Sequence, residues 1–203
     1  MDTQTKTIKT KNKKVIMPSI NSSTIKVQKR DGRQEPLDIN KIHFVVEEAC
    51  EGLPGVSASQ IEMNANIQFY DGMTTKDIQN VLVRSANDLI SLEAPNYQYA
   101  AARLLSYDVR KEAHGQYEYI PLLKLVLRNI RLGVYDKGIV DKYTTSEIKR
   151  FNTWIKRDRD LNFTYAGLRQ VVDKYLVQDR SSGALYDTPQ DMYMMIAATL
   201  FAD

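Results

Sequence analysis

The hydrophobic and polar positions of the chain become regular at Thr24, where they predict a β-hairpin. Hydrophobic and polar side chains alternate over residues 25–30, which is the period of a half-buried strand. Asp31-Gly32 is typical of a two-residue type I′ turn, in which both central positions have positive φ. A return strand over residues 33–35 then meets Pro36, which fits an edge strand or a strand end.

Four helices are predicted between this hairpin and Gly115, because each has a starting signal and an apolar stripe. Asp38 is the expected N-cap of the first helix. Ser57-x-x-Gln60 and Thr74-x-x-Asp77 have the spacing of capping boxes and open the second and third helices, and Pro95 marks the start of the fourth. The residues expected to face inward are Ile42, Val45, Val46, Ala49 and Leu53 in the first helix, Ile61, Ala65 and Phe69 in the second, and Ile78, Val81, Leu82, Ala86, Leu89 and Ile90 in the third.

The pattern after Gly115 predicts a second, mostly helical block. Helices are expected from Pro121 to Leu132, from Thr144 to Ile155, over residues 164–174 and over residues 192–201, with a short hairpin over 175–186. The last helix either packs back on the preceding helices or faces another polypeptide, and the pattern leaves both open. Its apolar residues are Met192, Met195, Ile196, Leu200 and Phe201.

Composition and charge exclude several classes of protein. Apolar residues make up 43% of the 203 residues and charged residues 26%, which is typical of a globular chain, and no apolar run approaches the roughly 20 residues of a membrane span. The net charge of +3 is uneven: residues 1–30 carry eight basic residues against one acidic residue, while the remainder carries 20 against 24. The overall charge therefore does not by itself indicate a nucleic-acid-binding protein. We expect residues 1–23 to be a disordered basic extension without a secretory signal, and both a removable presequence and a nucleic-acid-gripping tail stay open.

The sequence offers few residues for catalysis or metal binding. A single cysteine, Cys50, excludes a disulfide framework and a zinc ribbon made by this chain alone, and only two histidines are present. Cys50 is expected to be a core thiol rather than a reactive thiolate. Asp158-Arg-Asp160 is interpreted as a salt-bridged connection rather than as a catalytic carboxylate pair. No catalytic residue and no metal ligand are therefore predicted.

A nucleotide site is the chemistry that the residues of the hairpin and first helix suggest. Lys29, Arg30 and Lys41 lie on elements that the predicted turn brings together, and phosphates need such donors. Glu35 and Asp38 can accept hydrogen bonds from amino or sugar groups. Scattered surface lysines would give the same pattern, so the residues alone leave both readings open. An apolar wall for a base would come from Val27, Ile39 and Ile42, and Lys111 would approach from the far side.

Several motifs resemble those of a known family. One motif is similar to the ATP-cone, a nucleotide-sensing regulatory domain. It consists of Val27-x-Lys29-Arg30-Asp31-Gly32, followed by Glu35 and by Asp38-x-x-Lys41-Ile42. Over residues 24–203 the chain resembles the N-terminal region of the large (alpha) subunit of class I ribonucleoside-diphosphate reductase. The likeness continues through residues 67–72, 94–99, 101–104, 115–118, 158–160, 174–180 and 186–190.

The resemblance implies a mostly helical α+β fold in three parts. A basic extension, 1–23, would precede a nucleotide-binding regulatory domain at 24–115, in which a small hairpin caps a four-helix ATP-cone. Residues 116–203 would form the helical N-terminal part of the catalytic region, with a short β-hairpin and without the catalytic barrel.

The resemblance also implies a ligand, ATP or dATP with Mg²⁺, acting as an allosteric effector. Lys29, Lys41 and Lys111 would hold its phosphates, and Thr75 at the start of the third helix is explained equally well as an N-cap. Gln79 replaces a histidine of the relatives and Tyr107 replaces a phenylalanine, which leaves open whether dATP inhibits. The implied nucleotide-binding residues are Lys29, Glu35, Pro36, Leu37, Asp38, Ile39, Asn40, Lys41, Thr75 and Lys111.

The implied function is control of the reduction of ribonucleotides to deoxyribonucleotides for DNA synthesis, in the cytoplasm and without a membrane or nucleic-acid partner. The catalytic cysteines and barrel would lie beyond residue 203, so the chain alone is expected to be an inactive split-gene product or truncation. Its expected partners are the remainder of the large subunit and the small radical-bearing subunit, in an oligomer. The alternatives are a stand-alone nucleotide-responsive binding protein and a nucleic-acid-associated protein acting through its Lys-rich tail.

Overall fold

The computed structural model describes residues 25–202, so the expectations for residues 1–23 lie outside the described residues. Strands β1 (Lys26–Gln28) and β2 (Gln34–Pro36) pair antiparallel, with Val27 opposite Glu35. Four helices follow and confirm the predicted order of a hairpin and four helices. They are α1 (Ile39–Cys50), α2 (Ala58–Asn66), α3 (Thr75–Asn87) and α4 (Tyr97–His114).

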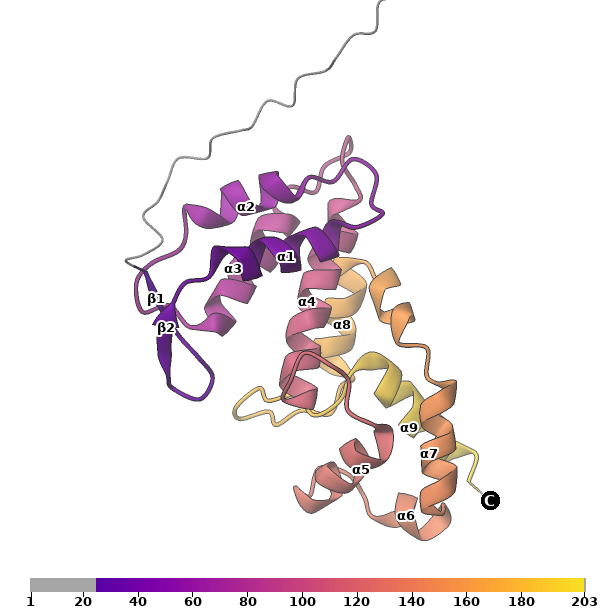
Figure 1. Ribbon diagram of the computed structural model, residues 1–203. Helices are drawn as coiled ribbons and strands as arrows, with labels where there is room; N and C mark the ends of the chain where they lie inside the picture. Colours follow the sequence, from indigo (N-terminus) through magenta and orange to yellow (C-terminus); the bar gives the residue numbers. More distant parts are fainter. Residues whose placement is uncertain (1–24, 203) are drawn as a thin grey trace, which may run out of the picture.

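The second half is helical as well and lies at the other end of the molecule (Figure 1). Its elements are α5 (Leu122–Arg131), α6 (Gly138–Lys142), α7 (Thr145–Trp154), the 3-10 helix η1 (Arg157–Asn162), α8 (Tyr165–Lys174) and α9 (Pro189–Leu200). The short helix α6 was not expected from the pattern. Helices α4 and α8 pack side by side in the middle of the molecule and connect its two ends (Figure 1).

One hydrophobic core runs from the hairpin end of the molecule into α8. It joins Val46 and Leu104 of the first four helices to Leu168 and Val172 of α8. A second, smaller core lies among α5, α7 and α9 and includes Leu125, Ile148 and Ala198. The second block therefore contributes to both cores, because α8 completes the first one. None of the helices over residues 25–202 has the length and hydropathy that a membrane span requires.

The turn between β1 and β2 differs from the prediction of a type I′ turn. Gly32 has a φ of +86°, whereas no residue other than glycine within 25–202 has a positive φ, so Asp31 does not. The Lys29 N–H donates to the Arg33 carbonyl over 2.8 Å and the Gly32 N–H donates to the Lys29 carbonyl over 2.9 Å. This is the pattern of a three-residue loop closed by a glycine in the left-handed region.

Two expectations about α2 are wrong. Ser57 is its N-cap residue, yet its side chain makes no capping hydrogen bond. Gln60 is engaged elsewhere, because its Oε1 accepts a hydrogen bond from the Tyr97 hydroxyl over 2.5 Å. Phe69 lies beyond the end of the helix, although it still packs against the core. The expected capping box at Thr74 is confirmed, and Thr144 forms another with Glu147 at the expected start of α7.

The expectation that Ile90 faces inward is wrong. Ile90 is 39% exposed because α3 ends at Asn87, so the helical period no longer applies to it. Leu132, the expected last residue of its helix, lies just past the end of α5 and is 58% exposed. The hairpin expected over residues 175–186 lies in a ribbon over residues 175–187 with a single β-bridge, between Gln178 and Leu185.

The last helix packs back on the preceding helices along one face only, and whether its other face contacts another polypeptide stays a prediction. Met192 is buried and Met195 packs against the second core, so one face of α9 closes back on the chain. Ile196, Leu200 and Phe201 are 48%, 72% and 81% exposed.

Candidate functional site

A pocket of about 120 Å³ lies where the hairpin meets α1, α3 and α4. It gathers charged residues from separate elements, among them Lys29 from the hairpin loop, Lys41 from α1 and Lys111 from α4. Seven of the ten predicted nucleotide-binding residues line it: Lys29, Glu35, Leu37, Asp38, Lys41, Thr75 and Lys111. Pro36, Ile39 and Asn40 do not line the pocket; they belong to the segment that leads from β2 into α1.

Local signals in the sequence fix the positions of these side chains. Asp38 caps α1 and accepts hydrogen bonds from the backbone N–H groups of Asn40 and Lys41, which places Lys41 in the first turn. The capping box at Thr74 makes Thr75 the first residue of α3. The hairpin is held against this end of α3, because the Gln28 N–H donates to the Met73 carbonyl over 2.9 Å.

The polar part of the pocket carries more cations than carboxylates. Lys29 Nζ lies 2.6 Å from Glu35 Oε1, and Lys41 Nζ lies 3.9 Å from the same oxygen and 3.6 Å from Asp38 Oδ2. The hydrogen bond from Lys29 lowers the pKa of Glu35. Burial lowers the pKa of Lys111, and the nearby Arg30 cation lowers it further. A negatively charged ligand would relieve this concentration of positive charge.

The other wall of the pocket is apolar. Val27 and Ile42 lie there as expected, whereas Ile39 is 41% exposed and lies off the pocket. Gln79 lines the pocket as well, and its Nε2 donates to the Leu104 carbonyl over 2.7 Å. The remaining apolar residues of the pocket are Val45, Ile78 and Leu82. They were predicted only to lie on the buried faces of their helices, because periodicity does not show which part of a helix face borders a pocket.

A second hollow, of about 430 Å³, adjoins the pocket and shares Lys29 and Thr75 with it. It also exposes Arg30 and Lys76, two cations that are paired with carboxylates of α4. Arg30 NH2 lies 2.8 Å from Asp108 Oδ1, and Lys76 Nζ lies 3.1 Å from Glu112 Oε2. Lys76 was not among the predicted binding residues, although its place next to Thr75 at a helix start is a signal for an anion.

Cys50 and Asp158-Arg-Asp160 were predicted not to be catalytic, and their surroundings differ. Cys50 is partly buried, and desolvation raises its pKa to about 11, so its thiol stays protonated at neutral pH. Asp158 and Asp160 lie in η1, and neither forms an ion pair within residues 25–202, so the expected salt-bridged connection is wrong. Burial instead raises the pKa of Asp160 to about 7. Over the same residues, no three His, Cys, Asp or Glu side chains gather as they would around a metal ion.

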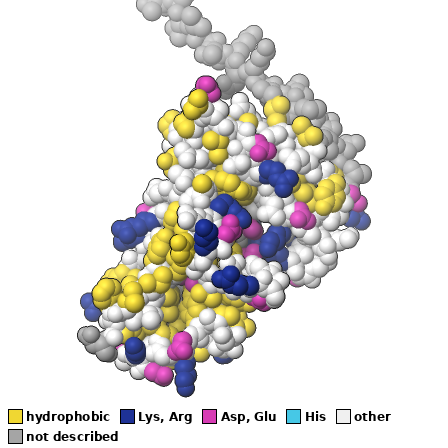
Figure 2. All heavy atoms as spheres, turned by 180° about the vertical axis from the view of Figure 1, so that it is seen from behind, with side chains coloured by type: hydrophobic (Ala, Val, Ile, Leu, Met, Phe, Trp, Pro, Cys, Tyr) yellow, Lys and Arg dark blue, Asp and Glu magenta, His cyan; other side chains and the backbone are white. Residues whose placement is uncertain are grey.

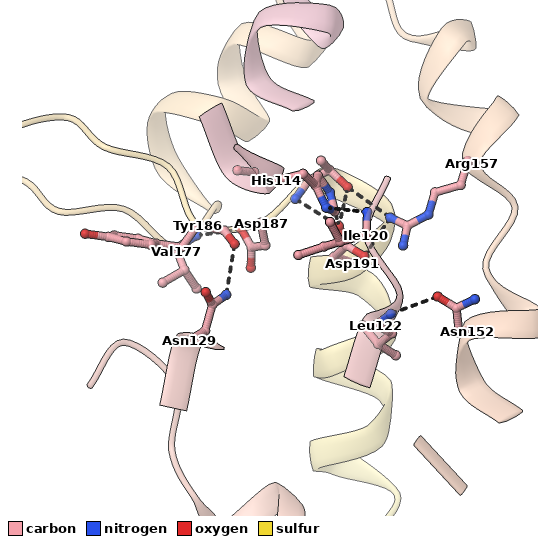
Figure 3. A network of polar contacts seen from close by, with 12 residues as sticks. His114, Ile120, Leu122, Asn129, Asn152, Arg157, Val177, Tyr186, Asp187 and Asp191 are labelled. Carbon is pink, nitrogen blue, oxygen red and sulfur yellow. Dashed lines mark hydrogen bonds and ion pairs between the residues drawn. The ribbon is translucent and has the colours of Figure 1, made fainter. Parts of the chain in front are cut away.

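A buried polar network joins the end of α4 to α9 (Figure 3). His114 Nε2 lies 3.1 Å from Asp191 Oδ2, and the Ile120 N–H donates to His114 Nδ1 over 3.3 Å. Because Nδ1 accepts, Nε2 is the ring nitrogen that donates to Asp191. Arg157 NH1 completes the group at 2.6 Å from Asp191 Oδ1. The start of α9 is therefore tied to the helix that supplies Lys111.

The fold and the pocket together define a class of protein. Residues 25–112 match the ATP cone domain, and residues 161–203 match the ribonucleotide reductase all-alpha domain. The chain thus contains an ATP-cone domain, as the hairpin motif indicated.

The curated relatives give the particular family. The chain is 45% identical to subunit alpha of ribonucleoside-diphosphate reductase 1 from Escherichia coli, over 177 residues that make up 87% of this chain and 23% of the relative. The corresponding protein of Salmonella typhimurium is 44% identical over 90% of this chain and 24% of its own length. The reductase subunit alpha of phage T4 is 40% identical over 88% of this chain and 24% of its own. The chain is therefore similar to the N-terminal region of ribonucleoside-diphosphate reductase alpha subunits and spans about a quarter of their length.

Proposed function

We propose that this chain is the nucleotide-sensing part of a ribonucleotide reductase. It binds ATP or dATP, accompanied by Mg²⁺, in the pocket at the hairpin, and the bound nucleotide controls the reduction of ribonucleotides to deoxyribonucleotides. The observation that carries the proposal is the convergence of Lys29, Lys41 and Lys111 on one pocket, within the residues that match the ATP cone domain.

The pocket suggests a role for each group. The three lysines hold phosphates, because ammonium groups form strong charge-assisted hydrogen bonds to phosphate oxygens. The base lies on the apolar wall that includes Val27 and Ile42. A phosphate replaces Glu35 as the partner of Lys29, and the freed Glu35 accepts hydrogen bonds from sugar or amino groups together with Asp38. The intervening residues Pro36, Leu37, Ile39 and Asn40 position these carboxylates and Lys41.

Calorimetric titration with MgATP tests the site. Lys41→Ala should weaken binding by about 10-fold or more, because a lost hydrogen bond to a charged group is worth roughly 1.5–3 kcal/mol. Lys149→Ala is the matched control, since Lys149 is exposed on α7 and lies outside both hollows; it should bind like the wild type. A wild-type protein that does not bind ATP at millimolar concentration, or an equal affinity of both variants, would contradict the proposal.

We further propose that Gln79 sets the relative affinity for ATP and dATP. Its side chain reaches the pocket while one amide N–H is held by the Leu104 carbonyl. Gln79→His should therefore change the ratio of the ATP and dATP dissociation constants, whereas Lys41→Ala should weaken both equally. Titration of the two nucleotides against each variant measures the ratio, and an unchanged ratio in Gln79→His removes this role.

We also propose that the exposed part of α9 contacts the remainder of a reductase large subunit, which works with the small radical-bearing subunit in a cytoplasmic oligomer. Figure 2 shows hydrophobic side chains gathering on the half of the molecule that contains α9. A hollow of about 550 Å³ there is lined by Met192, Met195, Ile196 and Leu200. The curated relatives that match are alpha subunits about four times as long as the matched region.

Reconstitution tests this partner. The chain mixed with a C-terminal reductase fragment and the small subunit should reduce a ribonucleoside diphosphate, and Ile196→Asp should abolish the effect while leaving ATP binding intact. If the two polypeptides do not associate at micromolar concentration, the chain acts as a stand-alone nucleotide-responsive protein instead.

A further inference from the structure

The last two turns of α4 bring the nucleotide pocket and the second half of the chain together. Asp108 pairs with Arg30 of the hairpin loop, and Lys111 lines the pocket. His114 is buried against Asp191 of α9. Glu112 lies between these groups and contacts both sides through its two carboxylate oxygens.

Glu112 Oε2 lies 3.1 Å from Lys76 Nζ, next to Thr75 of the pocket. Its Oε1 accepts a hydrogen bond from the Leu185 N–H, also over 3.1 Å. Leu185 belongs to the ribbon over residues 175–187 that leads into α9. The next residue, Tyr186, is held in turn by its carbonyl, to which Asn129 Nδ2 donates over 2.9 Å (Figure 3).

The hollow beside the pocket suits the phosphates of a nucleotide. Ligand pockets have volumes of about 300–1,000 Å³, so the pocket of about 120 Å³ accommodates only part of a nucleoside triphosphate. The adjoining hollow of about 430 Å³ has Lys29, Arg30 and Lys76 among its lining residues, and Glu112 is the carboxylate that faces them there. A nucleotide whose inner phosphates lie at the three lysines of the pocket would therefore extend its outermost phosphate past the shared residue Lys29 toward Lys76.

We propose that Lys76 is shared between the nucleotide phosphates and Glu112, so that Glu112 couples nucleotide binding to the ribbon over residues 175–187. The inference rests on the proposed function of the pocket. When Lys76 turns to a phosphate, Glu112 loses its cation and is repelled by the phosphates. Its remaining hydrogen bond, from the Leu185 N–H, then strengthens. By thermodynamic reciprocity, any change that holds Glu112 against the ribbon also raises the affinity for the nucleotide.

Hydrogen exchange of the Leu185 amide, followed by NMR with and without MgATP, tests the coupling in the whole chain. In the wild type, saturating ATP should slow this exchange by about 2- to 10-fold. Glu112→Gln keeps an acceptor for the Leu185 N–H but does not pair with Lys76. We therefore expect it to bind ATP about 2- to 5-fold more tightly, the range of a partly exposed ion pair, and to lose the response of the Leu185 amide.

Two further variants separate the explanations. Lys76→Gln should weaken ATP binding by about 3- to 10-fold and also abolish the exchange response. Asp173→Asn makes the same change of charge at an exposed i,i+4 pair on α8 and should behave like the wild type in both measurements.

The outcomes distinguish this inference from the function on which it rests. If ATP binds and Leu185 exchange does not change, or if Glu112→Gln keeps the wild-type affinity and response, the coupling is wrong and the nucleotide site stands. If the wild type does not bind ATP at all, both are wrong.

Discussion

At the scale of single residues, Asp187 predicts a pH dependence of stability. Its side chain is 1% exposed and accepts hydrogen bonds from the Tyr135 hydroxyl over 2.9 Å and from the Val177 N–H over 3.1 Å. Desolvation raises its pKa to about 7. Between pH 4 and 7 the folded protein therefore binds more protons than the unfolded chain, and this group's contribution to the free energy of unfolding falls as the pH rises.

Asp187→Asn should remove this contribution while keeping an acceptor for the Val177 N–H, and its amide N–H can donate to the Tyr135 hydroxyl in place of the bond that Tyr135 now donates. Between pH 5 and pH 8, the free energy of unfolding of the variant should rise by on the order of 2–3 kcal/mol relative to that of the wild type. Urea titrations at a series of pH values measure the difference. Glu147→Gln is a comparison of opposite sign: hydrogen bonds from Thr144 lower the pKa of Glu147, so its contribution is lost as the pH falls through the folded pKa. Parallel pH profiles for the wild type and Asp187→Asn would show that the buried carboxyl is not perturbed.

The residues of the candidate site differ in whether the sequence could predict them. Lys29, Lys41 and Lys111 were suggested by the residues themselves and assigned to phosphates by a resemblance, and the structure brings them to one pocket. Lys76 and Glu112 escaped prediction because their significance depends on a contact across 36 residues and on the backbone of Leu185, 73 residues further on. No local sequence pattern encodes contacts between residues so far apart in the chain.

At the scale of elements, two similar capping motifs should differ in their contribution to stability. Thr74 Oγ1 accepts a hydrogen bond from the Asp77 N–H over 3.0 Å, whereas the Ser57 side chain makes no capping hydrogen bond. Thr74→Ala should lower the free energy of unfolding by about 1 kcal/mol, and Ser57→Ala should stay within about 0.5 kcal/mol of the wild type. Urea denaturation followed by circular dichroism compares them; equal losses would mean that Ser57 caps α2 in solution.

The same contrast explains which elements the sequence predicted. Helices that begin at a satisfied local cap, at Asp38, Thr74 and Thr144, were placed correctly. The ribbon over residues 175–187 is closed as the expected hairpin by backbone hydrogen bonds from the Tyr186 N–H to the Val177 carbonyl and from the Asp179 N–H to the Ala184 carbonyl. Its contact with α4, in which the Leu185 N–H donates to Glu112, could not be predicted from the ribbon's own sequence.

At the scale of the whole molecule, the shared core predicts that the two ends unfold together. Arg103 of α4 contacts both ends of this core, since its NH1 donates to the Ala49 carbonyl of α1 over 3.2 Å and its Nε donates to the Leu161 carbonyl of η1 over 3.4 Å. Leu168 of α8 is fully buried in the same cluster as Ala49. The boundary predicted at residues 115 and 116 would instead make the two ends separate units.

Leu168→Ala distinguishes these arrangements. The cavity that it leaves should lower the free energy of unfolding by roughly 2–5 kcal/mol, whereas Leu92→Ala, at a side chain that is 96% exposed, should change it by less than about 0.5 kcal/mol. The single tryptophan, Trp154 on α7, reports on the second half, and the methyl NMR signal of Ala49 reports on the first. Because Leu168 joins the two halves, both probes should shift to the same lower urea midpoint. Separate midpoints, with only the tryptophan transition moved, would show that the cone domain folds independently of α8.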